Sequence, residues 1–99
     1  MLHTVNKSPF DRGALEACFR FAKQGSAVLL IEDGVYAATR GTAVAKQVEE
    51  ALKNITIYAL APDLEARGMQ NRVMDGVRLV DYAGFVDLVA ELDAVQSWF

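Results

Sequence analysis

The sequence predicts an α/β fold, a three-layer α/β/α single domain with a mainly parallel sheet of four to five strands. Residues 26–31 are almost wholly apolar and show no polar alternation, which is typical of a parallel strand covered on both faces. Short apolar runs alternate with helical patterns along the chain, as in βαβ units. The 99 residues suit one domain, residues 1–99, and residues 26–31 would be its central strand.

The first strand is predicted over residues 1–5, and a helix follows it. Ser8 can cap this helix, Pro9 suits its first position, and Asp11 stands where a capping-box acid would. Gly25 is placed to end it in a left-handed conformation. The apolar residues at helical spacing are Ala14, Leu15, Cys18, Phe21 and Ala22.

The rest of the chain repeats this alternation. The predicted elements are a helical turn over residues 35–38, a helix from Thr42 to about Lys53, a strand over 55–60, a short helix over 62–67, a loop over 69–75 and a strand over 77–80. Asp81 can cap a last helix. Its predicted inward residues are Tyr82, Phe85, Val86, Val89 and Leu92. Residues 95–99 are predicted to add a fifth short strand.

Composition narrows the classes of function. The net charge of −3 and the scattered Lys and Arg residues argue against direct nucleic-acid binding. No apolar segment reaches the ~20 residues of a membrane span, and no signal-peptide pattern is present. A single cysteine favours a reducing, cytoplasmic location. The hydrophobic fraction of 53% exceeds the usual ~45–50%, which suggests apolar surface buried against partner chains.

Cys18 is the only thiol and the only candidate for a persulfide or thiolate nucleophile. Its place on the apolar side of the first helix is more typical of a small buried hydrophobe. A low thiol pKa usually needs a cationic neighbour or a helix N-terminus, and Cys18 is about three turns into the predicted helix.

His3 is the only histidine, and no residues at metal-ligand spacing accompany it. A histidine that packs locally in its strand is therefore the favoured interpretation. Acid–base chemistry remains the alternative. Without a glycine-rich phosphate loop, the sequence predicts no nucleotide cofactor.

Four acids follow predicted strand ends at one edge of the sheet: Glu32, Asp33, Asp63 and Asp81. They could bind a divalent cation, or they could form turns and cap helices. Capping is the favoured interpretation because Asp commonly precedes Gly or a helix.

Trp98 and Phe99 place large apolar side chains at the end of the chain. Aromatic residues are enriched in interfaces, so a contact with another protein is one hypothesis. A tail that folds onto its own domain is the other.

Four segments together resemble the DsrH/TusB family, the small subunits of the DsrEFH and TusBCD sulfur-relay complexes. These segments are MLHTVNKSPF at residues 1–10, LLIEDGVYAA at 29–38, PDLEARG at 62–68 and VDYAGFVDL at 80–88. The resemblance covers essentially the whole chain. Cys18 matches a first-helix cysteine of DsrH-type members, which favours the sulfur-oxidation branch.

The resemblance implies an α2β2γ2 heterohexamer with DsrE-like and DsrF-like (TusD-like and TusC-like) subunits. It also implies a DsrC-like or TusE-like carrier that exchanges sulfane sulfur as a cysteine persulfide. The main active cysteine is expected on the DsrE/TusD-type partner, with Cys18 as a secondary persulfide site.

Two alternatives to the sulfur-oxidation role stay open. One is a TusB-type subunit in tRNA wobble uridine 2-thiolation, and the other is a purely structural subunit without chemistry of its own. A weaker third alternative is a free-standing domain that binds a metal or small molecule at the acidic edge. For Glu32-Asp33-Gly34 the resemblance favours a turn that leads into a helical segment, so Asp33→Ala is expected to disturb folding or assembly before chemistry.

Overall fold

The computed structural model describes residues 1–10, 13–92 and 95–98. β2 (Ala27–Leu30) lies at the centre of a five-stranded sheet with strand order β4-β3-β2-β1-β5. The other strands are β1 (Leu2–Val5), β3 (Thr56–Leu60), β4 (Arg78–Val80) and β5 (Val95–Trp98). Every neighbouring pair is parallel. The predicted fold class and the central position of the apolar run are both confirmed.

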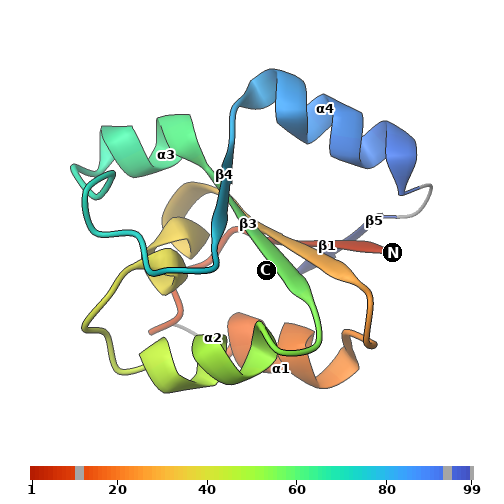
Figure 1. Cartoon of the computed structure of the whole chain (residues 1–99), viewed down its shortest axis with the longest axis horizontal. Helices are drawn as coiled ribbons and strands as arrows, with labels where there is room; N and C mark the ends of the chain where they lie inside the picture. The colour runs from red at the N-terminus through yellow and green to blue at the C-terminus, as the bar shows by residue number, and fades with distance from the viewer. Residues whose placement is uncertain (11–12, 93–94, 99) are drawn as a thin grey trace.

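The helices form the outer layers. α1 (Ala14–Phe21) and α2 (Ala45–Ala51) lie on one side of the sheet, and α4 (Tyr82–Glu91) lies on the other (Figure 1). The 3₁₀ helix η1 (Glu32–Ala38) and α3 (Ala61–Ala66) follow the carboxyl ends of β2 and β3. None of these described helices is long and apolar enough to cross a membrane.

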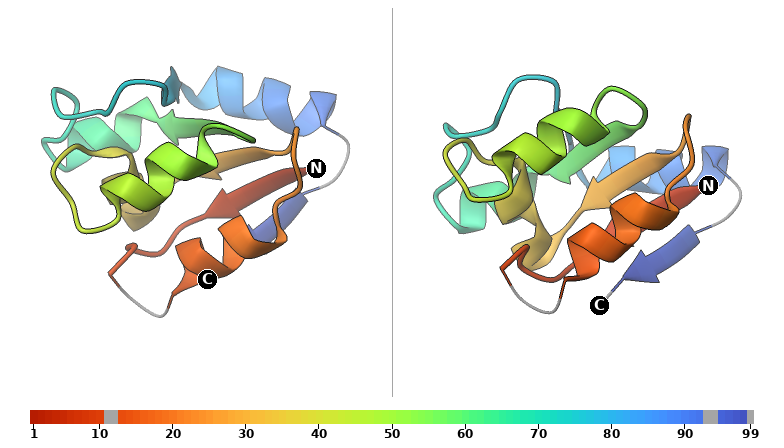
Figure 2. Two further views of the ribbon diagram at one scale, coloured as in Figure 1. Left: turned by 60° about the horizontal axis from the view of Figure 1, so that its bottom comes forward. Right: turned by 90° about the horizontal axis from the view of Figure 1, so that it is seen from below.

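β5 occupies the edge of the sheet beside β1, although the two strands come from opposite ends of the chain. Leu2 is paired with Val95 and Val5 with Trp98. Both views in Figure 2 place β5 beside β1 and close to α1. β5 therefore places the C-terminal residues next to β1, the first strand of the chain.

Three predictions about helix ends are wrong. α1 begins after Gly13, while the Ser8 hydroxyl accepts a hydrogen bond from the backbone N–H of Phe10 in a turn; Asp11 lies outside the described residues. Gly25 has a positive φ of 87°, but α1 has already ended, so Gly25 serves a turn that leads into β2. α2 begins after Val44 without a side-chain cap, so Thr42 does not cap it.

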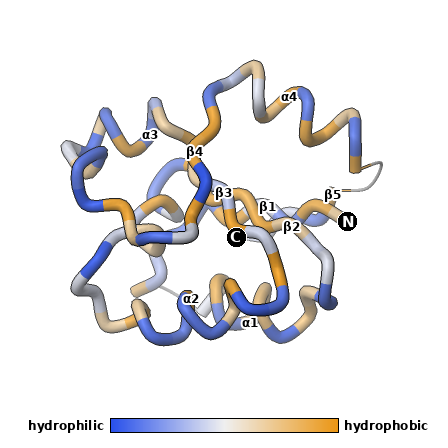
Figure 3. Tube along the Cα trace, in the orientation of Figure 1, coloured by the Kyte–Doolittle hydropathy of each residue, from blue (hydrophilic) through white to orange (hydrophobic). Residues whose placement is uncertain are grey.

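The predicted inward face of α4 is partly wrong. Asp81 caps the helix as expected, and its Oδ1 accepts a hydrogen bond from the Gly84 N–H at 2.8 Å. The side that packs on the sheet carries Phe85, Leu88 and Leu92. Tyr82, Val86 and Val89 are exposed. Hydrophobic residues recur along α4 (Figure 3) over more of its circumference than one helix side on this sheet can bury.

The core is divided by the sheet into two unequal clusters. The larger one packs α1, α2, η1 and α3 against the strands, with Val28, Leu30 and Ile57 among its fully buried residues. The smaller one lies under α4 and contains Leu2, Ala27, Leu29 and Leu88. Adjacent residues of β2 alternate between the two clusters, as expected for a strand with both faces covered.

Candidate functional site

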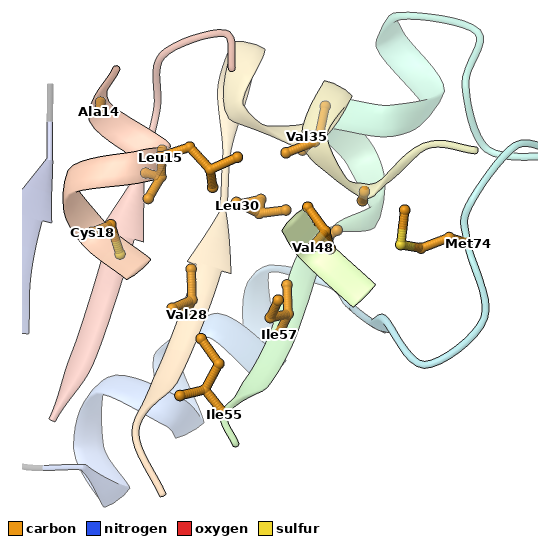
Figure 4. Close-up of a cluster of buried hydrophobic side chains, with 14 of the residues drawn as sticks. Ala14, Leu15, Cys18, Val28, Leu30, Val35, Val48, Ile55, Ile57 and Met74 are labelled. Atoms are coloured by element: carbon orange, nitrogen blue, oxygen red, sulfur yellow. The ribbon is translucent and has the colours of Figure 1, made fainter. Parts of the chain in front are cut away.

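Cys18 lies inside the larger cluster. Its side chain has no solvent exposure, and it packs among residues of α1 and β2 (Figure 4). Burial raises the pKa of the Cys18 thiol to about 12. A thiol in this environment is protonated near neutral pH, and the thiolate is the form that attacks sulfur. The surroundings of Cys18 are those of a packing residue, and its role as a persulfide carrier stays a prediction.

The buried position of Cys18 follows from the spacing of the apolar residues along α1. Ala14, Leu15 and Cys18 fall on one side of the helix and are buried against the sheet. Phe21, predicted on the same side, is 63% exposed at the end of the helix. Its ring instead stacks on Trp98, with ring centroids 5.7 Å apart.

His3 and Trp98 are joined by the pairing of β1 with β5. The Trp98 Nε1–H donates a hydrogen bond to His3 Nδ1 at 3.1 Å. An indole nitrogen can only donate, so Nδ1 is the accepting nitrogen and the ring proton of neutral His3 lies on Nε2. Burial, with a smaller contribution from the positively charged amino terminus, lowers the pKa of His3. The side chain is therefore a neutral donor near pH 7.

An open pocket of about 470 Å³ lies beside this pair, lined by residues of β1 and β5 and by the segment between the end of α1 and the start of β2. Its described lining residues are Met1, His3, Phe21, Lys23, Ser26, Gln96 and Trp98. Of the two hypotheses for the tail, the one in which it folds onto its own chain is confirmed for Trp98. Phe99 lies outside the described residues.

Three of the four acids at the carboxyl edge hold turns or helix ends: Asp81 caps α4, and Asp33 and Asp63 contact the turn after β2. Asp63 Oδ2 accepts a hydrogen bond from the backbone N–H of Glu32 at 2.6 Å. Arg67 forms an ion pair with Asp33 at 2.9 Å, and it also donates to the backbone carbonyl of Asp63 at 3.1 Å. Within the described ranges, no three His, Cys, Asp or Glu residues converge as metal ligands. The favoured capping interpretation agrees with these contacts.

The same edge contains a tight backbone contact. Glu32 has a φ of 50°, an unusual value for a residue with a side chain. Gly34, two residues later, lies so close to the Val5 backbone that a Cβ would collide with the Val5 carbonyl. The turn after β2 therefore packs on the end of β1, and the ties from Asp63 and Arg67 hold it there.

Tyr82, Val86 and Val89 form an exposed apolar surface on α4, called here the α4 surface. These residues are spaced i, i+4 and i+7, so they share one side of the helix. They are 60%, 66% and 40% exposed. A contiguous apolar face on a small protein is typical of a surface that binds another protein.

Sequence reasoning missed two of these features. Arg67, which holds both Asp33 and Asp63, was placed in a short helix without a partner. No local signal was available for its ion pair, because Asp33 lies 34 residues away in the sequence. The α4 surface was assigned to the core because five apolar positions were treated as one face. These five positions cover a wider part of the helix circumference than one packed side does, and this width was the available signal.

Comparison with known proteins identifies the family. Residues 7–95 match the family described as DsrH like protein. The chain is 36% identical over 98 residues to Protein TusB of Pectobacterium parmentieri, covering 99% of this chain and 100% of the relative. It is 37% identical over 102 residues to Protein TusB of Escherichia coli strain K12, with the same coverage.

A solved structure supports the fold. The crystal structure of the ychN protein from E. coli superimposes with a TM-score of 0.81 and 19% identity, covering 97% of each chain. The structural likeness supports the fold alone, whereas the sequence matches identify the family. The chain belongs to the DsrH-like family, as its four characteristic segments predicted.

Proposed function

We propose that this chain is a TusB-type subunit of a sulfur-relay complex that serves 2-thiolation of the wobble uridine of tRNA. Relatives named TusB, 36–37% identical along the whole chain, support this branch. The sulfur-oxidation branch, which the resemblance favours through Cys18, is the second candidate. Its support is the helix cysteine alone, which here occupies a buried packing position.

Within such a complex, the proposed task of this chain is assembly. The α4 surface is the observation that carries this proposal. It exposes Tyr82, Val86 and Val89 along a helix that already packs on the sheet through other residues. Covering the exposed apolar area of these side chains stabilises a contact by roughly 25 cal/mol per Å² removed from water. A DsrE-like or DsrF-like (TusD-like or TusC-like) subunit in an α2β2γ2 heterohexamer is the proposed occupant.

The α4 surface itself indicates the chemistry of that partner. Asp87 and Glu91 are exposed on the same helix. With 3.6 residues per turn, they lie away from the side that carries Tyr82, Val86 and Val89, so they do not border the α4 surface. An exposed apolar side of this kind fits a partner whose contact surface has an apolar centre.

The chemistry of the relay is assigned to a partner cysteine. Cys18 is fully buried, and its thiol pKa of about 12 opposes formation of the thiolate. A persulfide on Cys18 would require an opening of the larger cluster. The proposal therefore takes this chain as a structural subunit that a TusE-like carrier approaches in the assembled complex. A secondary persulfide at Cys18 is the competing proposal.

The assembly proposal is tested by Val86→Lys in cells that co-express the relay subunits. We expect a charge in the α4 surface to reduce recovery of the complex by at least about tenfold, because it places an unpaired ammonium in a desolvated contact. Gln47→Lys on α2 is the matched control: it adds the same charge at an exposed position on the other side of the sheet. Equal recovery of both variants would contradict the proposal.

The branch is tested by the identity of the chains that co-purify with this protein. A TusE-like carrier and a tRNA thiolase would support tRNA thiolation, whereas a DsrC-like carrier and dissimilatory sulfur enzymes would support sulfur oxidation. A stable, unassociated chain that binds a divalent ion would overturn both proposals. That outcome would favour a free-standing domain with its site at the acidic edge.

A further inference from the structure

The pocket beside His3 and Trp98 has the dimensions and lining of a small-ligand site. Its volume of about 470 Å³ falls within the usual range of roughly 300–1,000 Å³ for such sites. Phe21 and Trp98 stack with an interplanar angle of 21°, so two nearly parallel aromatic rings form part of its wall. Met1 adds a further apolar side chain. A flat apolar group can pack against this wall with little rearrangement.

The polar groups of the pocket are fixed by the fold. His3 is 4% exposed, and its Nδ1 is occupied by the Trp98 N–H. The remaining ring nitrogen, Nε2–H, is a donor without a hydrogen-bond partner among the described residues, and the imidazole lines the pocket. Ser26, only 8% exposed, adds a hydroxyl group from the start of β2.

The charge that the described side chains give the pocket is positive. Among the described residues that line the pocket, Lys23 has the only charged side chain, and none is Asp or Glu. The protein as a whole has a net charge of −3, so this local excess of positive charge does not follow from composition. The lysine and the His3 N–H donor both favour a ligand atom that accepts hydrogen bonds and carries negative charge.

We propose that this pocket binds a small planar monoanion, an aromatic ring that bears one carboxylate or sulfonate group. The ring packs against Phe21 and Trp98, and the anionic group lies between the Lys23 ammonium and the His3 Nε2–H. The His3–Trp98 hydrogen bond is the positioning element, because it fixes the ring proton on the nitrogen that remains available. This site is independent of the proposed function, since it uses neither Cys18 nor the α4 surface.

Trp98 is the only tryptophan and His3 the only histidine, so each gives a unique NMR signal. The experiment titrates naphthalene-2-carboxylate into the ¹⁵N-labelled full chain and follows the indole N–H resonance of Trp98. We expect a saturable shift of this resonance together with the imidazole signals of His3. Shifts confined to other regions, such as α4, or no saturable shift at all, would overturn the proposal.

Lys23→Met keeps an apolar stem and removes the charge. We expect it to weaken binding of the carboxylate about tenfold. Lys53→Met is the matched control, because Lys53 is exposed and paired with Glu50 away from the pocket; it should leave affinity unchanged.

Naphthalene-2-carboxamide keeps the ring but lacks the charge. It should bind the wild type about tenfold more weakly than the carboxylate does, and it should bind Lys23→Met as it binds the wild type. Equal affinity of the carboxylate for wild type and Lys23→Met would overturn the assignment of an anionic ligand.

Discussion

The two faces of the sheet differ in how completely they are covered. On one face, α1, α2 and η1 enclose the larger cluster, and Cys18 and Val48 are removed from solvent. On the other, α4 covers a smaller cluster and exposes Tyr82, Val86 and Val89 on its outer side. The enclosed face holds the only thiol of the sequence, whereas the other face leaves three apolar residues of α4 exposed.

This difference separates stability from association. The enclosed face buries its apolar groups within the chain, so substitutions there should change the free energy of unfolding. The α4 surface gains from burial only when a partner covers it, so substitutions there should change assembly and leave folding nearly intact. Each of the following predictions tests one side of this comparison, beginning with the largest effect.

Gly34→Ala should produce the largest loss of stability. A Cβ at Gly34 collides with the Val5 carbonyl, and neither backbone can move without disturbing the contact between η1 and β1. We expect a loss of more than about 3 kcal/mol in urea denaturation. Gly25→Ala is the control, since its φ of 87° favours glycine but nothing lies within 4 Å of the added Cβ. It should cost only about 1 kcal/mol; equal losses would show that the close contact is absent.

Val48→Ala and Val86→Ala compare the same change on the two sides of the sheet. Val48 is fully buried and Val86 is 66% exposed. We expect Val48→Ala to cost about 2–3 kcal/mol, because it leaves a cavity in the larger cluster. Val86→Ala should cost less than about 0.5 kcal/mol in the isolated chain. Similar losses in thermal or urea denaturation would contradict the assignment of Val86 to an open surface.

His3 should make stability depend on pH. Because burial lowers its pKa below 6.5, the folded state binds fewer protons than the unfolded state in the interval between the two pKa values. Stability is therefore expected to fall as pH decreases from about 6.5 through the folded-state pKa. The imidazole resonance of the single histidine gives this pKa directly. A value at or above 6.5 would contradict the buried, neutral His3.

Asp33→Ala should have a small effect on folding. The Asp33 side chain is 60% exposed, and its ion pair with Arg67 is partly screened by solvent. We expect a loss of about 0.5–1 kcal/mol in urea denaturation. Asp33→Asn separates charge from side-chain shape, and it should recover part of the loss. A loss of relay activity in an assembled complex of normal stability would contradict a purely structural role for this edge.

Local signals in the sequence predicted the elements but not all their surroundings. The apolar run before Glu32 marked the central strand, and Asp81 marked the start of α4, because both depend on nearest neighbours. The α4 surface was misassigned because hydropathy shows what can be buried, and the extent of the facing sheet decides what is buried. The start of α1 was misplaced because the turn that holds Ser8 satisfies the same hydroxyl that a helix cap would use.

The pocket beside His3 could not be predicted from local signals. It depends on β5 pairing with β1, which joins His3 to Trp98 across a separation of 95 residues. The sequence indicated a fifth strand, but its edge position is a property of the whole topology. The same topology turns the exposed end of α1 toward Trp98, so Phe21 leaves the apolar stripe to which its spacing assigned it.

The central claim is that the enclosed face gives stability and that sulfur transfer uses a thiol of a partner. It is tested most directly by persulfide loading of the purified complex, followed by peptide mass spectrometry. We predict that sulfane sulfur appears on a cysteine of a partner subunit, that Cys18 remains an unmodified thiol, and that a Cys18→Ala complex of intact assembly transfers sulfur at an unchanged rate. A persulfide on Cys18, lost together with transfer in Cys18→Ala, would contradict the account.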